Sequence, residues 1–266
     1  MELFETGIIL MSPLLNMLIC AVSFVVALML EVIMLPRILL ISKLKRLYDL
    51  PNARKHHRSP TLRLTGVTFF PILILSFLPL VGMQALLLND SDFAYSSAFI
   101  FQFAFSLSGC LILVLLGIKN DLVRVRYSHK FLLQIMAACL LIASGTYIDN
   151  FQGLLGIYAL PSFVVYPFNL LLIVYIINAI NLINGVDGLT ASLSCLAAGA
   201  LGVLLLIQES YYYAPLAFAI VGMLIPLLFY STSARRKTFM GDTGSLTLGY
   251  TLALLAVHYG SQESTM

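Results

Sequence analysis

Long apolar runs alternate with short polar islands along the whole chain. A membrane-spanning helix needs about 20 predominantly apolar residues, and the runs match that length. They predict eight helices, near residues 14–36, 66–88, 96–116, 131–147, 162–180, 189–207, 213–230 and 245–259. The predicted fold class is an all-α polytopic membrane protein with about eight transmembrane helices. Residues 1–266 form one integral membrane domain, and its cytoplasmic loops are expected to form a cleft.

Composition and charge refine this picture. The chain is 60% hydrophobic and 10% charged, whereas a soluble domain carries about 25% charged residues. All 15 Lys and Arg residues fall on one side of the predicted helices, at Arg37 and within 43–63, 119–130 and 235–237. The positive-inside rule makes that side cytoplasmic and places both termini outside. The net charge of +3 reflects this topology, so nucleic acid is not an expected partner.

Three cytoplasmic islands carry an aspartate at a predicted helix end: Asp121, Asp187 and Asp242. A charged side chain costs about 2.5–3.5 kcal/mol at mid-helix in a membrane, so three on one face predict a site. Carboxylates suit Mg²⁺, and the nearby basic residues suit a phosphorylated substrate. Ser245 and Thr247 are expected to supply the cap and first turn of the eighth helix. The alternative for each loop is an ordinary Gly/Asp turn between spans.

Four islands carry recognisable strings in a fixed order. They read PNARKHH from Pro51, GIKND from Gly117, NAINLINGVDGL from Asn178 and FMGDTGSLTLGY from Phe239. In order and topology they resemble the polyprenyl-phosphate N-acetylhexosamine-1-phosphate transferases, glycosyltransferase family 4. The first string is more similar to the branch that uses UDP-N-acetylglucosamine than to the peptidoglycan branch.

The resemblance implies a reaction at the bacterial plasma (inner) membrane. Undecaprenyl phosphate would attack the sugar-linked phosphorus of a UDP-N-acetylhexosamine and release UMP, which would initiate cell-wall or surface-polysaccharide synthesis. The implied cofactor is Mg²⁺, with Mn²⁺ as an alternative. The expected partners are the two substrates and the lipid bilayer, and a homodimer is one alternative for the assembly.

The resemblance also implies roles for individual residues. The implied catalytic residues are Asp121, Asn120 and Lys130; the metal ligands are Asp242, Asn181 and Asp121; and the substrate-binding residues are Asn52, Arg54, Lys55, His56, Asn178, Asn181, Asn184 and Asp187.

The sequence departs from the family pattern in three places. Asn120 and Asn184 stand where the family has aspartates, and Thr65-Gly66 replaces a Gly-Gly pair. The family pattern also expects an H-x-H-H loop and further spans, so the chain is expected to be short relative to the family. An Asn keeps the shape of an Asp but removes its charge, which weakens attraction for a divalent ion.

Three hypotheses follow from these departures. The first is an active transferase. The second is a non-catalytic or truncated relative that binds lipid phosphate or a partner. The third is an unrelated transporter or scaffold. A transporter places ionisable groups near mid-membrane. Here only Glu31 qualifies, and its position near Arg37 at the inner end of the first helix predicts snorkelling or a local ion pair.

Overall fold

The computed structural model describes residues 2–45, 48–49, 61–62, 64–87, 93–154, 156–186, 188–210, 212–233 and 238–262. Within them it has eight helices: α1 (Glu2–Leu44), α2 (Phe69–Leu87), α3 (Phe93–Leu122), α4 (Tyr127–Ala143), α5 (Ser162–Ile183), α6 (Leu189–Ile207), α7 (Ala214–Thr232) and α8 (Gly241–Gln262). A 3-10 helix, η1 (Leu64–Thr68), leads into α2. Two antiparallel hairpins complete the fold: β1 (Tyr48–Asp49) with β2 (Thr61–Leu62), and β3 (Asn150–Leu154) with β4 (Ile157–Ala159).

The prediction of an all-α polytopic membrane protein is confirmed. Six of the described helices are long and apolar enough to cross a membrane, and α4 is a shorter apolar helix. The exception is α8, whose first turns carry Asp242 and several hydroxyl side chains.

Two helix ends differ from the prediction in a way that matters for the site. The third helix was expected to end near residue 116, but α3 continues to Leu122 and carries Asn120 and Asp121 in its last turn. The eighth was expected to begin near residue 245, but α8 begins at Gly241 and carries Asp242 in its first turn. Polar residues are tolerated in these turns because they face other helices instead of lipid.

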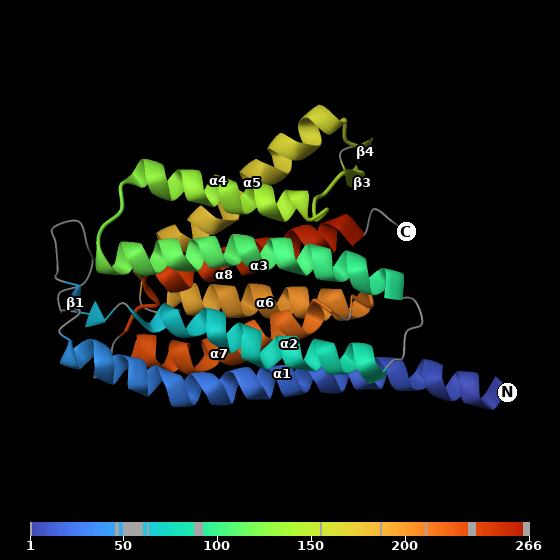
Figure 1. Ribbon diagram of the computed structural model, residues 1–266, viewed down its shortest axis with the longest axis horizontal. Helices are drawn as coiled ribbons and strands as arrows, with labels where there is room; N and C mark the ends of the chain where they lie inside the picture. Colours follow the sequence, from blue (N-terminus) through green and yellow to red (C-terminus); the bar gives the residue numbers. More distant parts are fainter. Residues whose placement is uncertain are drawn as a thin grey trace.

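The helices form a bundle in which α8 takes a central place (Figure 1). It packs against α3, α5 and α6, and its first turn also contacts η1. Helix α1 lies along one edge against α7, and α5 emerges from the opposite edge toward the β3–β4 hairpin. The start of α1 and the end of α8 lie at the same end of the bundle, and β1 lies at the other.

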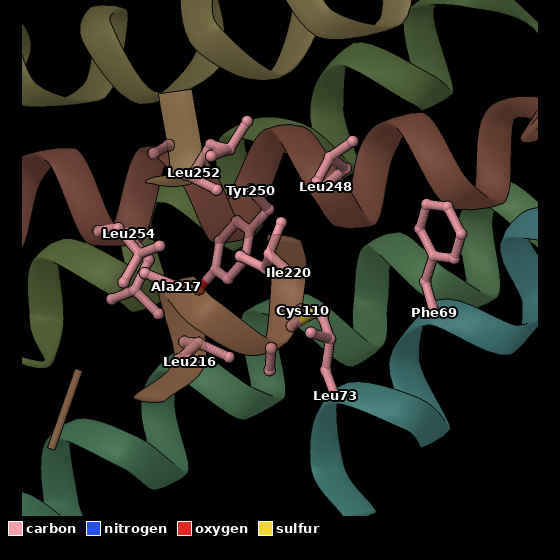
Figure 2. Close-up of a cluster of buried hydrophobic side chains, with 14 of the residues drawn as sticks. Phe69, Leu73, Cys110, Leu216, Ala217, Ile220, Leu248, Tyr250, Leu252 and Leu254 are labelled. Atoms are coloured by element: carbon pink, nitrogen blue, oxygen red, sulfur yellow. The ribbon is translucent and has the colours of Figure 1, made fainter. Parts of the chain in front are cut away.

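The centre of the bundle is closely packed around α8. The Tyr250 ring is fully buried among residues of α7, including Ala217 and Ile220 (Figure 2). Its hydroxyl end lies against Gly109 of α3, where a side chain would overlap it. Hydroxyls in the same helix are satisfied locally, since Thr247 donates to the carbonyl of Thr243 at 2.6 Å. Thr251 donates to the carbonyl of Thr247 at 3.0 Å in the same way.

Glycines set how closely α8 approaches its neighbours. A Cβ on Gly66 of η1 would overlap the backbone of Gly244, and a Cβ on Gly117 of α3 would overlap Thr243. The Gly66 amide also donates to the Met240 carbonyl at 2.9 Å, so η1 is joined to the segment leading into α8. Only glycine permits these backbone distances.

The prediction for Glu31 was wrong. Its side chain is fully buried and does not pair with Arg37, which is exposed. Instead, the Thr68 hydroxyl donates to Glu31 Oε2 at 2.9 Å, and Oε1 has no hydrogen-bond partner among the described residues. Glu31 and Arg37 are six positions apart on one helix, so they project from different faces.

Candidate functional site

The predicted site residues that the structure describes meet at one end of the bundle. They come from the end of α3, the start of α4, the end of α5 and the start of α8. The α3–α4 connection, the end of α5 and the start of α8 are far apart in sequence but pack together. The fold therefore brings Asn120, Asp121, Lys130, Asn181 and Asp242 into one hydrogen-bonded network.

Asp121 binds the first turn of α8. Its Oδ1 accepts the Asp242 backbone N–H at 2.8 Å, and its Oδ2 accepts the backbone N–H and the hydroxyl of Thr243 at 2.9 Å and 2.6 Å. The first N–H groups of a helix have no partner within the helix. Asp121 thus serves as an N-cap supplied by another helix, and its negative charge faces the positive end of the α8 dipole.

This arrangement corrects the expected cap of α8. Ser245 was expected to cap the helix, but it lies within the first turns and its hydroxyl accepts a hydrogen bond from Asn181 Nδ2 at 2.7 Å. Gly241 begins the helix with a φ of 68°, a left-handed conformation that favours glycine. The carbonyl of Gly241 accepts Asn184 Nδ2 at 2.8 Å, which joins the end of α5 to the start of α8.

Asp242 lies at the centre of the network. Its Oδ2 accepts the Asn120 Nδ2 group at 2.5 Å and the Lys130 ammonium at 2.7 Å. The Lys130 ammonium also donates to Asn181 Oδ1 at 2.7 Å. The Lys130 and Asp242 side chains are 12% and 22% exposed, so the ion pair is shielded from bulk water but still reachable by a ligand.

A second pair of amides extends the site along α4 and α5. Gln134 and Asn178 exchange two hydrogen bonds, at 3.3 Å and 2.9 Å. Asn178 was predicted as a site residue, and Gln134 was not. The sequence signal for Gln134 was its spacing, because it follows Lys130 by four positions and so lies on the same face of α4.

Five predicted substrate-binding residues lie outside the described part of the chain. They are Asn52, Arg54, Lys55, His56 and Asp187. Their roles, and the catalytic and metal roles predicted for the residues above, stay predictions.

The described residues do not fit a Mg²⁺ ion in this arrangement. Within that part of the chain, no group of three or more His, Cys, Asp or Glu residues could hold a metal. Both Asp121 oxygens accept hydrogen bonds from α8, and one Asp242 oxygen accepts two donors. Mg²⁺ requires nearly octahedral oxygen ligands, and three of the four carboxylate oxygens of Asp121 and Asp242 already accept hydrogen bonds from the protein.

The fold and the site define a multi-pass helical membrane protein with a polar, charged cluster at one end of its bundle. A family model described as glycosyl transferase family 4 matches residues 103–260. The chain belongs to this family. Membership confirms the resemblance seen in the sequence and removes the alternative of an unrelated transporter or scaffold.

Curated relatives agree with this assignment. The chain is 30% identical over 244 residues to a probable undecaprenyl-phosphate N-acetylglucosaminyl 1-phosphate transferase of Bacillus subtilis, covering 91% of this chain and 63% of the relative. It is 24% identical over 213 residues to an undecaprenyl-phosphate alpha-N-acetylglucosaminyl 1-phosphate transferase of Yersinia pestis, covering 77% of this chain and 53% of that relative. A phospho-N-acetylmuramoyl-pentapeptide-transferase of Listeria monocytogenes is 42% identical over 65 residues, 24% of this chain and 20% of its own length. The chain thus spans less than two thirds of each of these relatives.

Proposed function

We propose that this protein transfers N-acetylhexosamine 1-phosphate, most closely N-acetylglucosamine 1-phosphate, from a UDP-sugar to undecaprenyl phosphate. The observation that supports this is that the Lys130 ammonium contacts both Asp242 and Asn181. These contacts lie at the end of the bundle where α3, α4, α5 and α8 meet. The names of the relatives that cover most of this chain point to the same acceptor and sugar.

In the proposed reaction, an oxygen of the lipid phosphate forms a bond to the phosphorus that carries the sugar. The bond from that phosphorus to the oxygen it shares with the second phosphate breaks, and UMP leaves with that oxygen. Phosphoryl transfer depends mainly on positioning and on neutralising charge. Lys130 supplies a cation held by two helices besides its own, through Asp242 of α8 and Asn181 of α5. The Asn178 amide lies on the same helix as Asn181 and pairs with Gln134 of α4.

We propose that the lipid chain lies between α4 and α5. The two helices share the Gln134–Asn178 pair near the site, and farther along they line an apolar groove of about 640 Å³. Its walls include Ile142 of α4 and Leu170 of α5. Leu170 precedes Asn178 by eight residues, or about 12 Å of helix, a distance that an extended prenyl chain spans easily.

The resemblance predicts that Mg²⁺ assists this transfer. Because the described residues do not fit the ion, no step is assigned to it. In the proposed reaction the chain's own residues hold the phosphates near Lys130. They also fix the start of α8 against α3 and the end of α5.

The proposed function is tested by UMP release. Membranes containing the protein are incubated with undecaprenyl phosphate and UDP-N-acetylglucosamine, with Mg²⁺ and with EDTA in separate arms. We expect UMP from the unaltered protein and a decrease of about a hundredfold or more for Lys130→Met, as is typical when one charge-stabilising group is lost. Leu196→Ala, at a side chain of α6 that is 72% exposed, is the matched control and should retain full activity. UMP release no higher than that of Asp242→Ala would reject catalysis.

One observation favours a second candidate, a non-catalytic relative that binds lipid phosphate. The amide groups of Asn120 and Asn184 are bonded within the protein, to Asp242 and to the Gly241 carbonyl. If the unaltered chain releases no UMP but Asn120→Asp with Asn184→Asp does, this second candidate is correct.

A further inference from the structure

Asn120 is held in one orientation by its own hydrogen bonds. Its Oδ1 accepts the Val125 backbone N–H at 2.9 Å, just beyond the end of α3. A backbone N–H can only donate, so the oxygen must face Val125 and the NH₂ group must face Asp242. The 2.5 Å contact between Asn120 Nδ2 and Asp242 Oδ2 is therefore a donor meeting a carboxylate, and not an arbitrary assignment of the amide.

The same oxygen of Asp242 also carries the ion pair with Lys130. An ammonium and an amide, from α4 and α3, converge on Asp242 Oδ2 at 2.7 Å and 2.5 Å. The Oδ2 oxygen of this carboxylate is thus paired with the positive charge of Lys130 and hydrogen-bonded by Asn120. A charge-assisted hydrogen bond of this kind is about twice as strong as one between neutral groups.

An aspartate at position 120 would reverse this balance. With one oxygen still accepting the Val125 N–H, its other oxygen would face Asp242 Oδ2, and two negative oxygens at that distance repel each other strongly. Lys130 supplies one positive charge for two carboxylates, so the pair would require a further cation or a proton. Asp121 cannot relieve the repulsion, because it is itself a carboxylate and its oxygens only accept hydrogen bonds from α8.

We propose that Asn120 and Lys130 together take the place of a divalent cation at Asp242, so that this centre is complete without one. The inference deepens the proposed function and rests on it only for the role of the centre in handling phosphate. It goes against the predicted Mg²⁺ site and makes Asn120 and Lys130 the two residues that decide whether a divalent ion binds at Asp242.

The test measures Mn²⁺ binding without substrate, so its result does not depend on whether the protein releases UMP. The full chain is purified into lipid nanodiscs, and bound Mn²⁺ is counted by electron paramagnetic resonance. We expect the unaltered protein to bind no more Mn²⁺ than Asp242→Ala. We expect Asn120→Asp to gain one bound ion with an affinity at least about tenfold higher, because a second carboxylate then faces the ion. That gain should disappear in the double variant Asn120→Asp with Asp242→Ala.

Two results would overturn the proposal. One is Mn²⁺ binding by the unaltered protein that is lost in Asp242→Ala. The other is the absence of any gain in a folded Asn120→Asp protein. If Asn120→Asp does not fold, Lys130→Gln keeps the proposal testable: with the ammonium removed, Mn²⁺ should raise the melting temperature of this variant but not that of the unaltered protein. Equal melting temperatures of Lys130→Gln with and without Mn²⁺ would count against the proposal.

Discussion

Helices α5 and α8 have the same length, 22 residues, and opposite surroundings. Nearly every residue of α8 from Thr243 to Val257 is buried in the bundle, and its polar side chains contact other helices. Large apolar side chains of α5 are exposed along its length, including Phe163 at 80% and Leu182 at 80%.

The difference shows how a membrane changes the usual relation between burial and polarity. A helix facing lipid must be apolar because no water satisfies polar groups there. A helix enclosed by protein can carry hydroxyls, glycines and an aspartate, provided that neighbouring helices supply the partners. Residues predicted to bind substrate or metal lie where the two kinds of helix meet, at Asn178 and Asn181 on α5 and Asp242 on α8.

The largest effect is expected from removing the partner of the α8 terminus. Asp121→Ala leaves two backbone N–H groups and the Thr243 hydroxyl without their acceptor, and should lower the free energy of unfolding by about 3 kcal/mol. Asp121→Asn keeps one acceptor oxygen and should lose about half as much. Unfolding in mixed detergent micelles, followed by circular dichroism, gives both values. Asp149→Ala, at an exposed aspartate, is the control and should change stability by less than about 0.5 kcal/mol. If Asp121→Ala lowers the free energy of unfolding by no more than this control does, α8 does not depend on the cap.

A slightly smaller effect is expected where α8 approaches α3. In Gly117→Ala the new methyl group would overlap Thr243, with its Cβ 2.7 Å from the Thr243 nitrogen. Overpacking of this kind costs about 1–3 kcal/mol. Gly82→Ala on α2 is the matched control, since Gly82 is also a helical glycine and open space surrounds the position that its new methyl group would take. It should gain about 0.5–1 kcal/mol from helix propensity. The two thermal denaturation curves should therefore shift in opposite directions, and a shared direction would contradict the close packing of α3 against α8.

Glu31 should matter less than Asp121, although both are acids within helices. Within the part of the chain that the structure describes, it accepts one hydrogen bond, from Thr68, and its other oxygen has no partner. Glu31→Gln keeps an acceptor for Thr68 and should change the free energy of unfolding by less than about 1 kcal/mol. The measurement is the same detergent unfolding series. A loss larger than that of Asp121→Asn would mean that Glu31 has a charged role that its surroundings do not reveal.

The smallest effect is expected on the outer face of α5. Leu182→Ala shortens a side chain that is 80% exposed, which should change stability by less than about 0.5 kcal/mol. Ile177→Ala on the same helix is the contrast, because Ile177 is fully buried and its backbone contacts Gly249 of α8 closely. It should cost about 2 kcal/mol or more through the cavity it leaves. Thermal denaturation in one detergent compares the pair, and equal losses would place both side chains in the same environment.

The sequence predicted the number and type of the helices well, because the apolar runs required by lipid are long and continuous. It predicted their ends less well. Asn120 and Asp242 were placed outside the spans, since polarity was taken to mark the membrane edge. In the structure these residues lie in helices, since α3, α4 and α8 satisfy one another's polar groups. The sequence likewise suggested a pair for Glu31 with Arg37 by proximity, and the fold paired it with Thr68 of η1.

The sequence by itself determined that this is a helical membrane protein of glycosyl transferase family 4. The apolar run length that lipid requires and the motif strings are both local features, which can be read without knowing how the helices pack. Only the tertiary structure decided that Asp121 caps α8 and that Asn120 and Lys130 both bind one oxygen of Asp242. Those contacts join residues more than 100 positions apart, so their geometry depends on how the helices pack and not on the residue types alone. Whether an aspartate holds a metal, a helix end or a lysine is settled by which donors the fold brings to its oxygens.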